Sequence, residues 1–171
     1  MADTLNATDT DGTKILRGAL AGLLAGVVAS FAMDRFQALA ASLSPSDSDE
    51  EPATAKAADR IKQAAGGAPV TKAMQPLAGQ LVHYAVGAGL GVAYGIASEF
   101  RPGLASGYGA PFGVGVAAVL DEGAVPAVGL GTAPWDSPAS THAFSLASHL
   151  VFGVVADLVR RQVRSTLLPS A

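Results

Sequence analysis

The sequence predicts an all-α polytopic membrane protein, a bundle of four transmembrane helices packed through faces of glycine and other small residues. Three observations support this prediction. The chain has four long apolar stretches, and a membrane span needs about 20 apolar residues. Each stretch carries a small or polar residue at every fourth position, so these residues share one face of a helix. Finally, the chain contains 20 glycine residues, and faces of glycine let helices approach closely in lipid.

Composition excludes several other classes of protein. The 171 residues make one domain or one small bundle, and the net charge of -3 gives no reason to expect a nucleic-acid partner. Glycine is unfavourable by roughly 0.8–1 kcal/mol in a water-exposed helix, which argues against a soluble helical protein. The absence of cysteine excludes disulfides and cysteine metal sites.

The first helix follows a polar, acidic tail, residues 1–14, that we expect to be disordered. Residues 15–43 form the first transmembrane helix and its extension, which continues past Asp34 and Arg35. A signal peptide is the alternative, with residues 38–40 as a cleavage-like site. The long acidic start and the Asp-Arg pair before that site disfavour it. The small-residue face of this helix comprises Gly18, Gly22 and Gly26.

Residues 44–76 form a polar loop that carries a short surface helix. Acidic residues and Pro52 suit a helix N-terminus, and residues 53–65 are rich in alanine. Gly66 and Gly67 should end this helix. Its basic side chains, Lys56, Arg60 and Lys62, fit a solvated face better than contact with a membrane surface.

Residues 77–164 hold three further transmembrane helices, and residues 165–171 form a tail. The second and third spans cover residues 77–97 and 104–120, with a break expected near Gly123 and Pro126. A loop over residues 129–139 contains Trp135, which fits an interfacial anchor. The fourth span covers residues 141–159. The expected packing glycines of these helices are Gly87, Gly91, Gly95, Gly109, Gly113 and Gly153.

Positive charge predicts that both termini lie in the cytoplasm. With four spans, the N-terminus, the 98–103 turn and the C-terminus share one side of the membrane. The loop over residues 129–139 has no Lys or Arg, and the long 44–76 loop has few. The basic residues on the terminal side are Lys14, Arg17, Arg101, Arg160, Arg161 and Arg164.

A weak internal repeat relates the first helix to the third and the second to the fourth. Parallel repeats of this kind occur in transporters, although chance matches are also expected in a chain rich in glycine and alanine. The matching positions are Gly22, Gly26 and Asp34 with Gly109, Gly113 and Asp121, and His83 and Gly87 with His149 and Gly153.

Charged side chains inside apolar helices usually face a bundle interior, a cavity or a partner. Asp34 with Arg35, and Asp121 with Glu122, lie at the outer ends of the first and third helices. They could form an ion-pair cluster, but interfacial positions where helices leave the lipid are the favoured interpretation. At the inner ends, Glu99 and Asp157 should be neutralised by basic residues that include Arg101, Arg160 and Arg161.

His83 and His149 each lie on a glycine face within an apolar span, so both should point into the bundle. Histidine changes charge between pH 5 and 8 when unperturbed, which makes it the usual pH switch. A single structural hydrogen bond between helices is the more common role of a buried histidine. His83, His149, Asp121 and Glu122 are therefore the candidate proton-responsive residues.

No motif points to an enzyme or a cofactor. The sequence has no phosphate-binding loop, dinucleotide fingerprint, nucleophile elbow or paired-histidine zinc motif. We therefore expect no catalytic residues, no metal and no cofactor.

The second half of the chain resembles the YagU-like family of small bacterial inner-membrane proteins, over roughly residues 78–164. The order and spacing of several short motifs carry this resemblance. It implies an inner-membrane protein of largely unknown function that is linked to survival in acid, with no established catalytic residues. The motifs are His83-Tyr84, Gly91, Tyr94-Gly95, Glu99-Phe100, Pro102, Pro126, Gly129-Leu130, Pro134-Trp135, His149-Leu150-Val151, Arg160-Arg161 and Arg164.

The leading hypothesis is a non-enzymatic membrane protein of the acid-stress response. Its partners would be the lipid bilayer and either further copies of itself or other membrane subunits. An accessory or scaffold subunit of a larger membrane complex, and a small transporter or channel, are the alternatives.

Overall fold

The computed structural model describes residues 10–43 and 52–168, and all regular structure in these two ranges is helical. Four helical segments are long and apolar enough to cross a membrane. The predicted all-α class with four membrane-spanning helices is confirmed. In chain order, the segments are α1 (Asp11–Leu43), α3 (Gln75–Phe100), the helical run Pro102–Ala127 and α6 (Ala139–Thr166).

Most helix boundaries lie close to the positions expected from the sequence. α1 begins at Asp11, before the predicted start at Ile15, and helix α2 (Ala53–Ala64) occupies the predicted surface-helix segment. The first part of the predicted polar loop, residues 44–51, lies outside the described residues. Pro76 occupies the first turn of α3, where its missing N–H group has no intrahelical partner to lose.

The third spanning segment is irregular. It consists of η1 (Pro102–Gly109), α4 (Ala110–Val116), the π-helical turns of η2 (Ala117–Ala124) and α5 (Val125–Ala127). The break expected near Pro126 takes the form of these π turns, because proline has no N–H group to continue a regular α-helical ladder. Asp121 and Glu122 therefore project from a widened, non-standard part of the helix. The short turn η3 (Pro134–Asp136) follows before α6.

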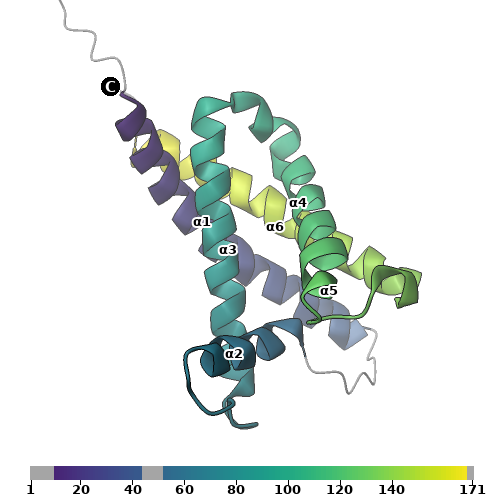
Figure 1. The fold of residues 1–171 in the computed structure, drawn as a ribbon. Helices are drawn as coiled ribbons and strands as arrows, with labels where there is room; N and C mark the ends of the chain where they lie inside the picture. The colour runs from purple at the N-terminus through teal and green to yellow at the C-terminus, as the bar shows by residue number, and fades with distance from the viewer. Residues whose placement is uncertain (1–9, 44–51, 169–171) are drawn as a thin grey trace, which may run out of the picture.

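The four long segments form two crossed, antiparallel pairs (Figure 1). α1 packs against α3 and α6, and α4 packs against α6. α3 and α4 are joined by η1 at one end and diverge toward the other end, where α2 lies (Figure 1). We call the first end the η1 end and the second the α2 end. The reversal between α3 and α4 uses Gly107 and Gly109, whose φ angles of 64° and 76° suit glycine.

Glycine backbones lie in direct contact where α1 crosses α3. A Cβ atom built on Gly22 would overlap the carbonyl oxygen of Gly91, and one on Gly26 would overlap that of Gly87. A Cβ atom built on Gly18 would likewise come within 2.8 Å of the carbonyl oxygen of Gly95. No residue with a side chain fits these positions without moving a helix, which is the property expected of close helix crossings in lipid.

The second helix pair repeats this contact. A Cβ atom on Gly109 would overlap the carbonyl oxygen of Gly153, and one on Gly113 would overlap that of His149. Phe112 of α4 stacks on Tyr94 of α3 with ring centroids 4.2 Å apart and lies 6.2 Å from Phe152 of α6. These aromatic side chains fill the space between helices that glycine leaves open.

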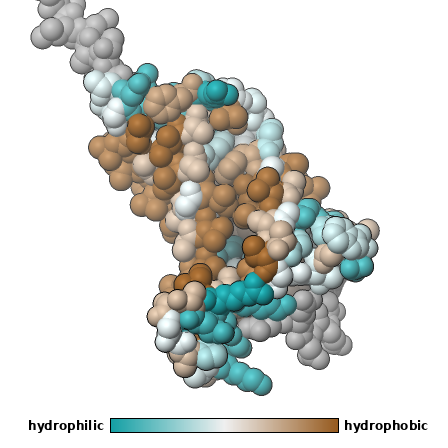
Figure 2. Space-filling model, in the orientation of Figure 1, coloured by the Kyte–Doolittle hydropathy of each residue, from teal (hydrophilic) through white to brown (hydrophobic). Residues whose placement is uncertain are grey.

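Large apolar side chains cover the outside of the bundle. Figure 2 shows a hydrophobic surface over the long helices and hydrophilic residues around α2. A soluble protein of this size would bury more of these side chains, whereas a lipid-facing surface leaves them outside. The structure is therefore that expected of a multi-pass membrane protein. The exposed residues include Leu20, Leu23, Leu24, Val27, Val28 and Phe31 on α1 and Leu81 and Val86 on α3.

Candidate functional site

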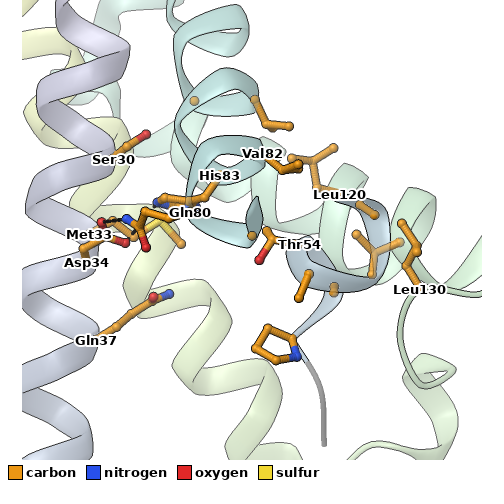
Figure 3. Close-up of a pocket in the computed structure, with 18 of the residues that line it drawn as sticks. Ser30, Met33, Asp34, Gln37, Thr54, Gln80, Val82, His83, Leu120 and Leu130 are labelled. Carbon is orange, nitrogen blue, oxygen red and sulfur yellow. Dashed lines mark hydrogen bonds and ion pairs between the residues drawn. The ribbon is translucent and has the colours of Figure 1, made fainter. Parts of the chain in front are cut away.

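A pocket of about 920 Å³ lies at the α2 end of the bundle (Figure 3). α1, α3, η2 and α6 provide its walls, and the start of α2 closes part of it. Most of the wall is apolar, with carboxylate, imidazole, amide and hydroxyl groups set among the apolar side chains. The polar members are Ser30, Asp34, Gln37, Thr54, Lys72, Gln75, Gln80, His83, Asp121 and His149.

The first polar group in the pocket joins α1 to α3. His83 Nε2 lies 3.2 Å from Asp34 Oδ1, and Gln80 Nε2 donates a hydrogen bond of 2.5 Å to Asp34 Oδ2. Figure 3 shows Asp34, Gln80 and His83 reaching toward one another across the helix crossing. Both Asp34 and His83 are mostly shielded, with 15% and 22% of their side chains exposed. An aspartate in such a position has a strong need for a positive or hydrogen-bonding partner.

The second polar group joins η2 to α6. His149 Nδ1 lies 3.3 Å from Asp121 Oδ2, and Ser145 Oγ donates a hydrogen bond to the same oxygen. His149 Nδ1 also lies 3.0 Å from the carbonyl oxygen of Ser145. A carbonyl oxygen only accepts, so Nδ1 carries the hydrogen in this bond.

These two Asp–His pairs occupy corresponding positions in the sequence repeat. Asp34 corresponds to Asp121 and His83 to His149, and the two N–O distances, 3.2 and 3.3 Å, are nearly equal. In both halves, the aspartate comes from the helix that begins the repeat and the histidine from the antiparallel helix packed on it. Both pairs line the same pocket. Two Asp–His pairs therefore lie around one space, although His83 faces its aspartate through Nε2 and His149 through Nδ1.

Two buried polar atoms in the pocket wall have no hydrogen-bond partner among the described residues. These are Ser30 Oγ and His83 Nε2, whose approach to Asp34 does not have hydrogen-bond geometry. Ser30 is completely buried and lies one turn before Asp34 on α1. A buried polar group usually has a partner, so these two atoms are exceptions, and both lie where α1 and α3 meet. Ser148 Oγ is also unpaired but does not line the pocket.

Hydrogen bonds to neighbouring loops hold α2 beside the pocket. Arg60 donates to the carbonyl oxygens of Val128 and Gly129, the latter at 3.0 Å. Asp59 accepts a hydrogen bond of 2.5 Å from the backbone N–H of Val70. Arg60 therefore acts as a link between α2 and the end of the third spanning segment, a role that its expected place on a solvated face did not suggest.

Glu122 lies beside the pocket but pairs with a different histidine. His142 Nδ1 is 2.6 Å from Glu122 Oε1, and His142 Nε2 is 3.1 Å from the carbonyl oxygen of Pro134. The neighbouring acids Asp121 and Glu122 thus contact different histidines on α6. Neither residue of the Glu122–His142 pair lines the pocket.

Asp34 and Arg35 do not form an ion pair cluster with Asp121 and Glu122. Asp34 faces the pocket, whereas the Arg35 guanidinium lies 5.3 Å from the centre of the Phe31 ring on the exposed side of α1. Successive residues on a helix point about 100° apart, so the two side chains diverge. The four residues of the candidate cluster therefore make four separate contacts.

The η1 end carries a second set of buried charges. Asp157 is completely buried and accepts hydrogen bonds from Tyr94, Arg160 and Arg161, with donor distances of 3.0, 2.7 and 2.6 Å. Glu99 pairs with Arg164 of α6 through two hydrogen bonds, and not with Arg101 as expected. These contacts tie α3 to α6, and none of these residues lines the pocket at the α2 end. They fit a structural role.

The chemistry available to the pocket follows from its charges. With neutral histidines, Asp34 and Asp121 outnumber the one lysine of the wall, Lys72, so the wall is net negative. Protonation of both histidines would make it net positive. Within residues 10–43 and 52–168, no group of three or more His, Asp or Glu side chains is arranged to hold a metal ion.

Sequence reasoning did not identify several residues of this site. Gln80 and Ser145 complete the environments of the two aspartates, and Lys72 is the basic member of the wall. Gln80 lies three residues before His83, so helical spacing places both on the same face as the pocket. That spacing could have identified Gln80 as a pocket residue. In the same way, the position of Tyr94 one turn from Gly91 on α3 could have indicated that it faces another helix, where it contacts Asp157.

Comparison with known proteins identifies a family for this chain. A family model described as a protein of unknown function (DUF1440) matches residues 64–158. The matched region is more than half of the chain and includes α3, the third spanning segment and most of α6. It contains His83, Asp121 and His149, whereas Asp34 lies before it. Neither the curated proteins nor the solved structures give a match.

Proposed function

Because the chain belongs to the DUF1440 family of proteins of unknown function, we propose that it is a non-enzymatic bacterial inner-membrane protein that responds to acid through its two Asp–His pairs. One observation carries the proposal: two Asp–His pairs, Asp34–His83 and Asp121–His149, line a single pocket. The resemblance to YagU-like proteins, which links this type of chain to survival in acid, supports the same function.

The proposed mechanism is a change in how strongly paired helices hold together. Each aspartate faces an imidazole and accepts a hydrogen bond from Gln80 or Ser145. An imidazole that gains a proton in acid would become the counter-ion of its aspartate. The α1–α3 and η2–α6 contacts then become ion pairs, and the shape and charge of the pocket change together.

The expected orientation in the membrane supports this mechanism. Lys14 lies 6.0 Å from the centre of the Phe100 ring, and Arg164 pairs with Glu99, so the start of α1 and the end of α6 lie at the η1 end. The positive-inside rule places this basic end in the cytoplasm. The pocket at the α2 end would then face the periplasm, the compartment that acid from outside reaches first.

Cysteine labelling tests this orientation, since the chain has no cysteine of its own. We expect Ala68→Cys, in the exposed loop after α2, to react with a membrane-impermeant maleimide in intact cells. Ser165→Cys, exposed near the end of α6, should react only after the cells are broken open. The reverse pattern would place the pocket on the cytoplasmic side and remove this support for acid sensing.

Acid survival tests the function itself. In cells that depend on this protein, the double variant His83→Gln and His149→Gln should abolish the survival advantage at low pH, because glutamine cannot take up a proton. His142→Gln is the matched control, since His142 lies outside the pocket wall. Both proteins must reach the membrane in equal amounts. Wild-type survival with the double variant would rule out the proposed mechanism.

A further inference from the structure

We propose that the pocket binds a lipophilic organic monocation, such as an aromatic or alkyl ammonium ion, between Asp34 and Asp121. The inference rests on the proposed function, because the same Asp–His pairs carry both. It adds a ligand that competes with protons for the two aspartates. The argument uses the size of the pocket, its mixed wall, its unpaired polar atoms and its net charge.

The size and lining of the pocket favour an organic ligand over a bare ion. A volume of about 920 Å³ lies within the range of pockets that hold drug-sized molecules. The wall is built mainly of aliphatic and aromatic side chains, which would contact an apolar body. No described cluster of side chains provides the set of ligands that a metal ion needs. The apolar members include Met33, Val82, Val86, Leu90, Val116, Leu120 and Phe152.

The polar atoms of the wall favour a positively charged ligand. Carboxylates line the pocket from α1 and from η2, so both would attract a cation bound in it. Ser30 Oγ, completely buried against Gly87 of α3, has no partner among the described residues and adds an unpaired polar atom to this wall. An anionic ligand would instead meet two carboxylates.

Charge balance indicates a monocation in particular. With neutral histidines the wall contains two aspartates and one lysine, so a single positive charge neutralises it. With both histidines protonated, the wall is positive and repels the same ligand. Binding of the cation and uptake of protons are therefore competing events, which is the thermodynamic basis of exchange between them.

Other charged or titratable groups around the two pairs do not reverse this balance. Arg35 lies against Phe31 outside the pocket, and Glu122 is paired with His142. On α2, Arg60 and Asp59 make backbone hydrogen bonds, and Lys56 has an interaction of its own. Tyr84 meets the His83 ring edge-on and remains neutral near pH 7, as phenols do.

The test uses the full chain in lipid nanodiscs, with tetraphenylphosphonium as the cation and tetraphenylborate as an anion of the same shape. We expect saturable binding of the phosphonium at pH 7.5 and binding at least about tenfold weaker at pH 5.5. The double variant Asp34→Asn and Asp121→Asn should lose most of the binding at pH 7.5. Asp136→Asn removes an exposed carboxylate outside the pocket and should bind like the wild type.

A second variant keeps the test decisive if the double variant folds poorly. Lys72 is exposed at the pocket wall, and Lys72→Gln should bind the phosphonium more tightly because a positive charge is removed. Equal binding of the borate and the phosphonium, or wild-type binding by a folded double aspartate variant, would overturn the proposal and indicate a lipid-filled apolar pocket. Binding that is insensitive to pH would overturn the competition with protons.

The outcome is separable from that of the proposed function. Acid survival is measured without added cation and depends on His83 and His149. Phosphonium binding at pH 7.5 depends on Asp34 and Asp121. If the double histidine variant survived acid like the wild type while cation binding still depended on Asp34 and Asp121, the acid response would be overturned. The cation site would be unaffected by that result.

Discussion

Replacing Gly91 with leucine is expected to separate α1 from α3 and to destabilise the protein severely. A Cβ atom at this position would overlap the carbonyl oxygen of Gly22 and come within 2.7 Å of the Cα atom of Gly26. Overpacking usually costs about 1–3 kcal/mol, and the upper end or more is expected where the colliding atoms are backbone. The loss should appear as a lower unfolding temperature in detergent, followed by far-UV circular dichroism.

Gly89 is the matched control on the same helix. It lies two residues from Gly91, and a Cβ atom there meets nothing within 4 Å. Gly89→Leu should therefore leave the unfolding temperature unchanged or raise it, because leucine favours the helix more than glycine does. Equal destabilisation by the two substitutions would show that helix propensity, rather than the close crossing with α1, decides the effect.

The second large effect is expected from Asp157→Ala. Asp157 is completely buried and accepts hydrogen bonds from Arg160, Arg161 and Tyr94. Its removal leaves the buried Arg160 without its carboxylate, and breaking a buried ion pair costs about 3–5 kcal/mol. We expect the variant to unfold at a much lower temperature, or to be recovered from the membrane in reduced amount.

Two further variants define the origin of that loss. Tyr94→Phe removes one neutral donor to Asp157 and should cost only about 0.5–1.5 kcal/mol. Asp136→Ala removes an exposed aspartate and should have little effect. If Asp157→Ala were as stable as Asp136→Ala, the buried cluster would contribute nothing net, and its role in joining α3 to α6 would have to be abandoned.

The fold follows from local features of the sequence to a large extent. The four apolar stretches correspond to the four candidate spans, and the alanine-rich segment forms α2. These features are local, since length, hydropathy and helix-breaking residues act within a few turns. The irregular third segment was harder to predict. Pro126 indicates a break, but whether the chain turns away or widens into π turns depends on packing against α6.

The candidate site was predictable only in part, for a geometric reason. His83 and His149 stand out as titratable residues on small-residue faces, and the repeat relates Asp34 to Asp121. The pairing of each aspartate with its histidine depends on how far one helix is shifted along another. That register is set by the opposition of Gly22 with Gly91 and of Gly113 with the backbone of His149, which a single sequence does not reveal. Because the helix register is not evident from one sequence, Arg164 was not predicted as the partner of Glu99.

Histidine-selective nuclear magnetic resonance would test the central claim most directly, because the chain contains only three histidines. The protein would carry ¹³C-labelled histidine in nanodiscs and be titrated from pH 8 to pH 5, with single His→Gln variants to assign each signal. The account predicts that the signals of His83 and His149 both change as they gain protons. Asp34→Asn should alter chiefly the His83 curve, and Asp121→Asn chiefly that of His149. Signals of both residues that stay constant over this range, or that ignore the aspartate substitutions, would contradict the account.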